Sequence, residues 1–311
     1  TVVLKPAEQT PLTALRLGEL IHEACFPECV VNIVTGFGPA PDGAGEALAA
    51  HMDVDKIAFT GETNTGRSIL RNAARNIKKV SLELGGKSPN VVLEDADVAG
   101  AVRGAMTGIF FNQGQVCCAG SRLFVHERIH EEFVDVFGRY ASAIKQGDPL
   151  DAGTEMGPQV SEEQMNRILS YVDVGREEGA KVVAGGGRAT EKGYYVQPTI
   201  LDGVTNSMRV AREEIFGPVS AVIRWKDEED LVRQANDTIF GLAAAVWTKD
   251  VKKAHRVARA IKAGTVWVNC YNAFDSASPF GGYKQSGFGR EMGIHALDLY
   301  TQVKSVWIDL S

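Results

Sequence analysis

Short apolar runs rich in β-branched residues alternate with longer amphipathic stretches along most of this chain. Such alternation is typical of α/β proteins, in which helices cover both faces of a largely parallel sheet. It therefore predicts an α/β fold. We expect strands at residues 2–4, 30–34, 56–60, 79–84, 90–93, 121–125, 180–183 and 221–225. We expect helices at about 11–25, 98–111, 131–144 and 162–178, with a short helix before the strand at 56–60 and one more helix ending near 76.

Length and composition limit the class of protein. At about 150 residues per domain, the 311 residues indicate about two domains. The formal charge of −6 offers no basic excess to nucleic acid, and no apolar run approaches the roughly 20 residues of a membrane-spanning helix. The five cysteines are sparse and odd in number, which argues against a disulfide framework and favours a cytoplasmic or other reducing compartment.

Both ends of the chain carry expectations. The chain begins at Thr1 with no initiator Met or signal region, as if already inside a strand, so we expect an upstream portion to be missing. Residues 301–310 alternate well enough for a strand, with Val306, Ile308 and Leu310 on one side. This strand would pair either within the chain's own sheet or with another subunit, and the sequence leaves both interpretations open.

A cysteine pair lies in the loop 112–120 (Asn-Gln-Gly-Gln-Val-Cys-Cys-Ala-Gly), which is rich in glycine and amides and lies between an expected helix and an expected strand. Loops in such places carry function more often than the elements that they join. A nucleophilic cysteine needs partial exposure and hydrogen-bond donors that stabilise its thiolate. Cys117 is therefore a candidate nucleophile, and the alternative is a buried structural cysteine.

Glu83 lies at the end of an apolar strand and is followed by Gly85 and Gly86. Burial there would raise the pKa of its carboxyl group, which suits a general base that works near neutral pH. The alternative is a salt bridge between Glu83 and Lys87.

Two segments are candidates for binding a nucleotide, although the chain has no GxGxxG motif. Residues 59–66 read as a strand, a Gly/Thr turn and a helix start, whose free N–H groups would hold a pyrophosphate or simply be capped. Lys5 and Glu8 follow the first strand, where open α/β sheets bind ligands. There Glu8 would accept hydrogen bonds from ribose hydroxyls and repel a 2′-phosphate, or both side chains would be solvated.

Taken in order, these segments resemble the aldehyde dehydrogenase superfamily, the NAD(P)-dependent enzymes that oxidise aldehydes to acids. Residues 82–86 (Leu-Glu-Leu-Gly-Gly) are similar to its glutamate motif, and 114–117 (Gly-Gln-Val-Cys) to its cysteine motif. Residues 213–219 (Glu-Glu-Ile-Phe-Gly-Pro-Val) and 279–287 (Pro-Phe-Gly-Gly-Tyr-Lys-Gln-Ser-Gly) resemble two further signatures. The resemblance covers essentially the whole chain, and the segment around Cys117 looks most like the branch that acts on aliphatic, aromatic and retinoid-like aldehydes.

The resemblance implies a Rossmann-like cofactor domain whose N-terminal part is missing, an α/β catalytic domain and a C-terminal oligomerisation strand. Residues 1–85 would form the partial NAD-binding domain, 86–285 the catalytic domain, 286–300 a return to the cofactor domain, and 301–311 the oligomerisation strand. It also implies a homo-oligomer, either a dimer or a tetramer.

The resemblance further implies a mechanism. Cys117 would attack the aldehyde, oxidation would leave a thioester, and Glu83 would activate the water that hydrolyses it, while Cys118 would be a bystander. NAD is the implied cofactor, with NADP disfavoured by Glu8, and no metal is expected. The implied cofactor contacts are Lys5, Glu8, Gly61, Leu84, Glu214 and Phe216, and the implied substrate contacts are Phe111, Val116, Phe274 and Phe280.

The resemblance leaves one residue and two alternative functions to be considered. Many relatives have Ser where Glu62 stands, and because a carboxylate disfavours a nearby phosphate, we leave Glu62 out of the cofactor contacts. A non-oxidising homologue, either an esterase that uses Cys117 and Glu83 or a structural protein that keeps the fold, is the alternative to an aldehyde dehydrogenase. An acylating enzyme that passes the thioester to coenzyme A is disfavoured because Glu83 offers water activation.

Overall fold

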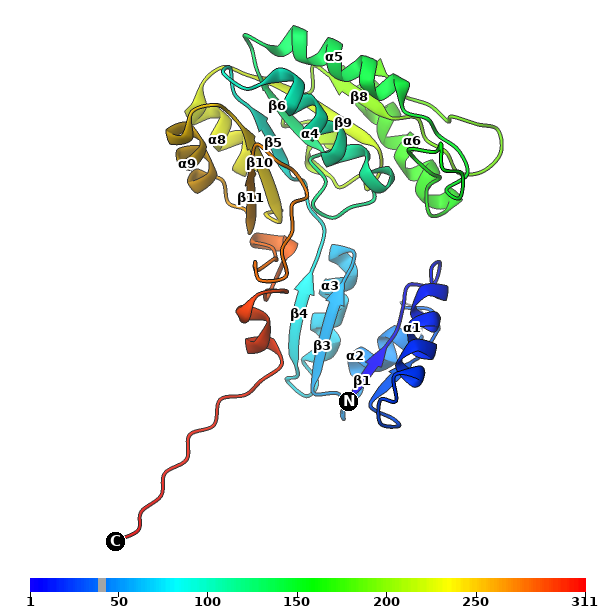
Figure 1. The fold of residues 1–311 in the computed structure, drawn as a ribbon, viewed down its shortest axis with the longest axis vertical. Coiled ribbons are helices and arrows are strands. Elements are labelled where there is room, and N and C mark those ends of the chain that lie inside the picture. Colours follow the sequence, from blue (N-terminus) through cyan, green and yellow to red (C-terminus); the bar gives the residue numbers. More distant parts are fainter. Residues whose placement is uncertain (39–42) are drawn as a thin grey trace. The chain divides into compact units, whose positions relative to one another are not determined.

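The computed structural model describes residues 1–38 and 43–311 and divides into two compact units, Thr1–Leu82 and Glu83–Ser311 (Figure 1). The first unit has a parallel pair of strands, in which Val2 lies opposite Val31, and a separate pair of neighbouring strands, β3 and β4. In chain order its elements are β1 (Val2–Leu4), α1 (Leu12–Glu23), β2 (Val31–Ile33), α2 (Ala44–Ala50), β3 (Lys56–Thr60), α3 (Thr63–Ala73) and β4 (Lys79–Glu83), whose last residue opens the second unit.

The second unit is built on a seven-stranded sheet with the order β11-β10-β5-β6-β9-β8-β7. Its neighbouring strands are parallel except for the edge pair of β7 and β8. The strands are β5 (Pro89–Val92), β6 (Arg122–His126), β7 (Lys181–Ala184), β8 (Thr199–Asp202), β9 (Val219–Trp225), β10 (Ala243–Trp247) and β11 (Thr265–Val268). The helices are α4 (Val98–Phe110), the 3₁₀ turn η1 (Phe111–Gly114), α5 (His130–Ala143), α6 (Glu162–Glu177), α7 (Arg209–Arg212), α8 (Glu228–Asn236) and α9 (Val251–Ala260).

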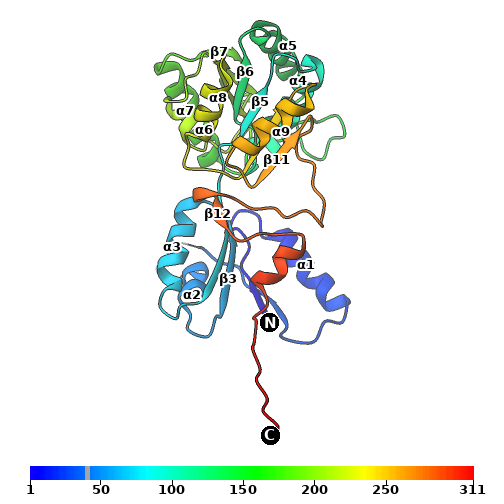
Figure 2. The same ribbon diagram turned by 90° about the vertical axis from the view of Figure 1, so that its left-hand side faces the viewer.

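Helices pack on both faces of this sheet (Figures 1 and 2). Because successive strand residues point to opposite faces, Val92 packs with α4 and α5 in one hydrophobic cluster, whereas Val91 packs with α6, α8 and α9 in the other. Both valines are fully buried, and each such side chain contributes about 1.5–3 kcal/mol to folding. Burial on both faces explains why the strands read as continuous apolar runs.

The chain after β11 contains little regular structure. The 3₁₀ turn η2 (Lys284–Ser286) leads into β12 (Gly287–Phe288), and the 3₁₀ helix η3 (Ile294–Leu299) follows. Residues 301–311 form neither helix nor strand and are exposed throughout. The interpretation of this segment as a strand of the chain's own sheet is therefore wrong.

The expected α/β fold is confirmed, and apart from the terminal strand expected at 301–310, each expected strand and helix is present within a few residues of its predicted bounds. The sequence left β8, α7, α8, β10, α9 and β11 unassigned. Among the described residues no helix combines the length and the apolar character that crossing a bilayer requires.

Candidate active site

The loop that carries Cys117 runs from η1 to β6 and begins with a strained turn. Asn112, Gln113 and Gly114 have left-handed φ angles of 47°, 57° and 70°. A left-handed conformation costs a non-glycine residue roughly 1–2 kcal/mol. At Gly114 only glycine fits, because an added Cβ would lie 2.2 Å from the carbonyl oxygen of Gly217. The turn is thus held against a second loop, which contains Phe216.

Cys117 and Cys118 have different environments. Cys117 is partly exposed, whereas Cys118 is 2% exposed, and its Sγ lies 3.5 Å from Oδ1 of Asn272. The hydrogen bond from the Cys118 thiol, helped by backbone N–H groups, lowers the pKa of Cys117 against the opposing effects of burial and of Glu214. The same contact and burial raise the pKa of Cys118. Cys117 is therefore the more acidic thiol of the pair, and Cys118, expected to be a bystander, is the largest cause of its lowered pKa, while the Sγ of Cys118 donates to Asn272.

Glu83 ends β4 and is buried, with 7% of its surface exposed. Its Oε2 has no hydrogen-bond partner among the described residues. Burial raises the pKa of Glu83 to about 8, and the charges of Cys117 and Glu291 add to this effect, while Arg290 opposes it. The carboxyl group is thus held as an acid that ionises near neutral pH.

The alternative salt bridge between Glu83 and Lys87 is absent. Lys87 is fully buried, and its Nζ has no hydrogen-bond partner in the part of the chain that the structure describes. Burial, helped by the positive charge of Arg122, lowers the pKa of Lys87 to about 7. The charges of Glu83 and Lys87 are therefore not paired with each other.

The glycines after Glu83 connect it to the cysteine loop. A Cβ on Gly86 would lie 2.4 Å from the backbone oxygen of Cys117, so the two backbones touch. Ser286 holds the turn from the other side, because its Oγ donates to the Gly85 oxygen at 2.7 Å and its backbone oxygen accepts from the N–H of Leu84 at 3.0 Å. Leu84, a predicted cofactor contact, is itself buried.

Glu214 and Phe216 lie on the loop after α7, beside the same turn. Oε1 of Glu214 accepts from the N–H of Gly86 at 3.0 Å. From α6, Gln164 donates to the backbone oxygen of Phe216 at 2.8 Å, and Arg167 donates to that of Glu214 at 3.1 Å. Phe216 has a left-handed φ of 57° and a ring that is 39% exposed, so this loop is fixed by its backbone and leaves the ring accessible.

Three of the four predicted substrate contacts share an apolar neighbourhood. The rings of Phe274 and Phe280 lie 5.5 Å apart, edge to face, and Val116 and Phe280 pack against the same hydrophobic cluster as Cys117. Phe111 is separate: it is 61% exposed and stacks on no other ring among the described residues.

In the first unit, Lys5 and Glu8 meet the glycine-rich loop after β2. The Nζ of Lys5 donates to the oxygen of Gly36 at 3.1 Å, and Oε1 of Glu8 accepts from the N–H of Gly38 at 2.6 Å. The Nζ of Lys5 lies 3.8 Å from Oε1 of Glu8. Backbone hydrogen bonds, with Lys5, lower the pKa of Glu8, so an ionised acceptor lies at the carboxyl ends of β1 and β2.

At the start of α3, the N-terminus of the helix is capped by a side chain. Glu62 is the N-cap, and its carboxylate accepts from the N–H of Thr65 at 3.3 Å and from Nδ2 of Asn64 at 2.8 Å. Gly61 precedes it with the ring of Phe59 where a Cβ would be, 2.5 Å away. An internal anion therefore occupies this helix N-terminus.

Sequence reasoning missed Glu291 and Arg290, which act on Glu83, and Asn272, which contacts Cys118. It also missed Ser286, which holds the turn after Glu83 through Gly85 and Leu84. Ser286 lies inside a quoted signature, which was its only sequence signal. No group of three His, Cys, Asp or Glu side chains suited to a metal occurs among residues 1–38 and 43–311.

Comparisons with known proteins agree with this geometry. The model of the aldehyde dehydrogenase family matches residues 1–306. The chain is 56% identical over 310 residues to a putative aldehyde dehydrogenase DhaS of Bacillus subtilis, and 54% identical over 308 residues to the mitochondrial aldehyde dehydrogenase of Homo sapiens. Those alignments cover 100% and 99% of this chain but 62% and 59% of the relatives, so the chain spans about three fifths of their length.

Solved structures give the same result. The NAD⁺ complex of an aldehyde dehydrogenase from Bacillus cereus is 54% identical, with a TM-score of 0.97 over 100% of this chain and 63% of that one. The aldehyde dehydrogenase KauB from Pseudomonas aeruginosa is 51% identical, with a TM-score of 0.97. This chain belongs to the aldehyde dehydrogenase family.

Proposed function

We propose that this chain carries the catalytic groups of an NAD-dependent aldehyde dehydrogenase, which oxidises an aldehyde to a carboxylic acid. The observation that carries the proposal is the contact at Gly86, which joins the loop of a thiolate, Cys117, to the turn of a buried acid, Glu83. A nucleophile with a lowered pKa and an acid with a raised pKa at one place are the requirements of covalent acyl chemistry.

In the first half of the reaction the Cys117 thiolate adds to the aldehyde carbon, and the carbonyl oxygen becomes an oxyanion. The backbone N–H of Cys117 faces the sulfur and stabilises its charge, and it is a donor for the developing oxyanion too. Loss of hydride from the former aldehyde carbon then leaves a thioester on Cys117.

In the second half, Glu83 removes a proton from water, the resulting hydroxide attacks the thioester carbon, and the Cys117 thiolate leaves. The negative charge of Cys117 is one cause of the raised pKa of Glu83. That charge is absent in the thioester, so the pKa of Glu83 falls at the stage that needs a base. The state of Cys117 thus affects when Glu83 ionises.

NAD, when bound, supplies the acceptor for the hydride. We assign Lys5 and Glu8 to the adenosine ribose, with Gly61 beside the pyrophosphate, and Leu84, Glu214 and Phe216 to the nicotinamide end. The ionised Glu8 suits two ribose hydroxyls and disfavours the extra phosphate of NADP. The exposed ring of Phe216 and the hydrogen bond of the Glu214 carboxylate with Gly86 are consistent with these roles.

The aldehyde class follows from the apolar side chains near Cys117. Phe274 and Phe280 stack edge to face, and Val116 precedes the nucleophile. We infer that they bind an apolar aldehyde, with the exposed Phe111 at its entrance.

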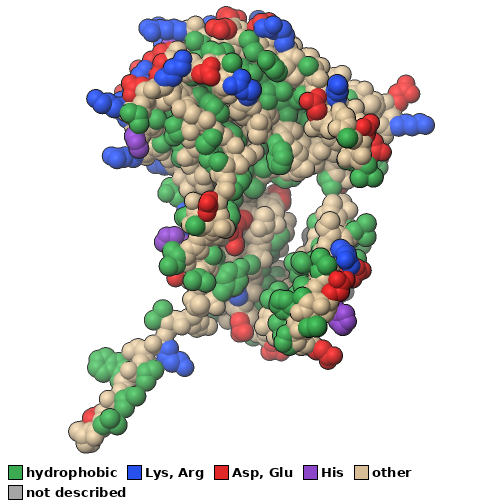
Figure 3. All heavy atoms as spheres, in the orientation of Figure 1, with side chains coloured by type: hydrophobic (Ala, Val, Ile, Leu, Met, Phe, Trp, Pro, Cys, Tyr) green, Lys and Arg blue, Asp and Glu red, His purple; other side chains and the backbone are tan. Residues whose placement is uncertain are grey.

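We also assign residues 1–85 to a partial cofactor domain, 86–285 to the catalytic domain and 286–300 to a return of the chain to the cofactor domain. The last segment, 301–311, carries exposed apolar side chains along its length (Figure 3). Because β11 is an edge strand of the seven-stranded sheet, we propose that this segment pairs with a second copy in a homo-oligomer. Deleting residues 301–311 would then lower the mass measured by light scattering.

The compartment is proposed to be a reducing one, such as the cytoplasm. All five cysteines are free thiols, and Cys25 and Cys29 are exposed.

The direct test is NADH formation by the purified chain with an apolar aldehyde. Cys117→Ala should abolish it, and Cys118→Ser is the matched control because it keeps a donor beside Cys117. Activity that survives Cys117→Ala would overturn the proposal. Hydrolysis of an ester by Cys117 with no NAD binding in calorimetry would favour the esterase instead.

A further inference from the structure

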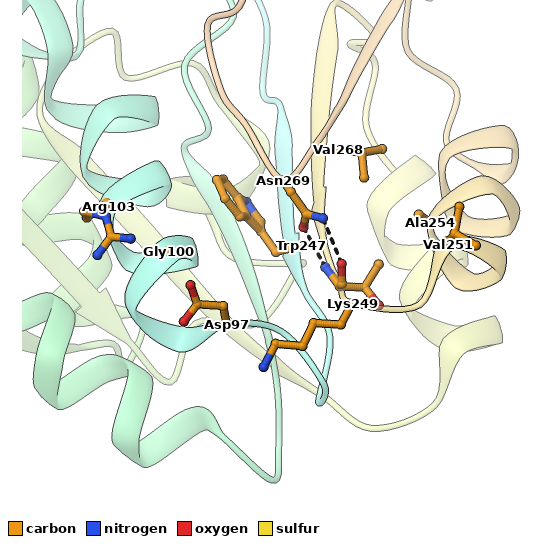
Figure 4. A pocket seen from close by; sticks show the side chains of 10 residues that line it. Asp97, Gly100, Arg103, Trp247, Lys249, Val251, Ala254, Val268 and Asn269 are labelled. Carbon is orange, nitrogen blue, oxygen red and sulfur yellow. Dashed lines mark hydrogen bonds between the residues drawn. The ribbon is translucent and has the colours of Figure 1, made fainter.

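A cleft of about 590 Å³ opens in the second unit between the N-terminal ends of α4 and α9 (Figure 4). Its walls come from the first two turns of α4, the first turn of α9 and the last residues of β10 and β11, Trp247 and Val268. The volume lies within the range of about 300–1,000 Å³ that small-molecule sites occupy.

The cleft is separate from the candidate active site. Glu83 and Cys117 precede β5 and β6, so they lie at the N-terminal ends of these parallel strands. Trp247 ends β10 and pairs with Val92 at the end of β5, so the cleft lies at the opposite, C-terminal edge. A strand of four or five residues separates the two edges by about 15 Å.

The topology favours ligand binding at this edge. From β5 the chain passes through α4 to β6 on one side, and from β10 it passes through α9 to β11 on the other. The point between β5 and β10 is therefore a switch point of the sheet, and open α/β sheets bind ligands in the crevice that such a point creates.

Two cations at the cleft lack protein partners. The side chains of Arg103 and Lys249 take part in no hydrogen bond or ion pair with the described residues. Asp97 faces the cleft from the start of α4 and makes no capping hydrogen bond. Nearby Asp95 is engaged, because it accepts from Oγ1 of Thr248 at 2.8 Å. The balance of these side chains favours a ligand with a negative charge.

The lining also has an apolar part, which is built around Trp247. The Trp247 indole donates to Oδ1 of Asn90 at 2.7 Å and lies where a Cβ on Gly104 would be, so it does not move freely. Val251 and Val268 expose 66% and 39% of their surfaces beside it. Mutual backbone and side-chain hydrogen bonds between Thr248 and Asn269 fix the rim (Figure 4).

We propose that this cleft binds a small carboxylate with an apolar chain, remote from Cys117. The carboxylate pairs with Arg103 and Lys249, and the chain packs on Trp247, Val251 and Val268. The carboxylic acids released by aldehyde oxidation belong to this chemical class, but the binding site stands independently of that reaction.

The test is titration of the full protein with hexanoate by isothermal calorimetry. Acetate, which lacks the long alkyl chain, and hexan-1-ol, which lacks the charge, are the comparison probes. We expect saturable binding of hexanoate and at least tenfold weaker binding of either analogue. Arg103→Ala with Lys249→Ala should weaken hexanoate binding at least tenfold, since a charge-assisted hydrogen bond contributes about 1.5–3 kcal/mol. The matched control is Arg139→Ala with Lys252→Ala, which removes two cations outside the lining and should change affinity less than twofold.

A second variant fills the cleft without weakening the fold. At Gly100, in α4, an added Cβ meets only the ends of two flexible side chains, Asp97 at 2.7 Å and Arg103 at 3.8 Å, and leucine is the better helix former. Gly100→Leu should therefore keep or raise the melting temperature and abolish hexanoate binding. Chain alkylated at Cys117 should still bind hexanoate. No binding to the wild type, binding unchanged in Gly100→Leu, or binding lost on alkylation of Cys117 would each overturn the proposal.

Discussion

The α-carbon of Gly86 lies against the carbonyl oxygen of Cys117, with no room for a methyl group between them. The turn that follows the buried acid and the loop that carries the nucleophile are therefore fixed to each other through their backbones. The relative position of these two segments therefore does not depend on the side-chain rotamers of Cys117 or Glu83.

Gly86→Ala should push these two segments apart, because its Cβ would lie 2.4 Å from the Cys117 oxygen. A misplacement of about 1 Å typically lowers the rate of a catalysed step by about 10²-fold. We expect kcat for aldehyde oxidation to fall by this order while the chain remains folded by circular dichroism. Gly153→Ala, at a surface turn, is the control, and equal activity of both variants would contradict the predicted contact.

Glu83 should give thioester hydrolysis a distinctive pH dependence. Its pKa of about 8 contains a contribution from the Cys117 thiolate, which the thioester lacks. We expect the rate of acid release in a single turnover to rise with pH and then level off. The apparent pKa of this rise should lie between the ordinary 4.5 of a glutamate and the value of about 8 that Glu83 has beside the thiolate. Glu83→Gln should slow release by about 10²–10⁴-fold and remove this dependence. A rate in the wild type that does not change with pH would exclude Glu83 as the base.

The buried side chain of Lys87 should lower the free energy of unfolding most at low pH, where it is protonated. Its ordinary pKa of 10.5 falls to about 7 in the fold, so its buried ammonium destabilises the folded chain fully below pH 7. As pH rises from 7 to 10.5 the unfolded chain keeps a proton that the folded chain has lost, and stability increases. Lys87→Met should thus stabilise by about 1–4 kcal/mol near pH 6, and less near pH 10, in urea unfolding. A gain that grows with pH would contradict this.

Glu62 should weaken the binding of NAD. Its carboxylate occupies the N-terminus of α3 by accepting from Thr65, where the helix dipole would otherwise favour a pyrophosphate. Glu62→Ser keeps a capping oxygen and removes the charge, so the Kd for NAD in calorimetry should fall several-fold. Glu46→Ser, in the first turn of α2, is the control. Weaker binding by Glu62→Ser would show that the carboxylate helps rather than hinders.

Cys118 should set the reactivity of Cys117. Its thiol is the largest cause of the lowered pKa of Cys117. Cys118→Ala should therefore move the pH midpoint of Cys117 alkylation by iodoacetamide upward, whereas Cys118→Ser, which retains a donor, should leave it nearly in place. Identical midpoints in all three proteins would return Cys118 to the role of a bystander.

The sequence predicted the fold to the extent that a local pattern determines it. Strand β3 (Lys56–Thr60) has the bounds expected from its apolar run. Strand β10 was left unassigned, because Ala243–Trp247 is alanine-rich and its identity as a strand depends on pairing with β5 and β11 on either side.

The site divides in the same way. Cys117 and Glu83 were found from local motifs, because a loop cysteine among glycines and an acid in an apolar strand stand out in the sequence. Glu291, which raises the pKa of Glu83, lies about 200 positions further along the sequence. Asn272, which accepts a hydrogen bond from Cys118, lies 154 positions after it. Only the folded chain brings such groups together, and nothing local marks them.

The three successive left-handed residues at Asn112, Gln113 and Gly114 have a consequence for how aldehydes are captured. The conformational entropy of orienting the nucleophile is lost once, when the chain folds, and not again each time a substrate arrives. Substrates of different length would therefore meet the same sulfur in the same direction, so that differences in their rates arise from the apolar side chains around it rather than from the cysteine itself.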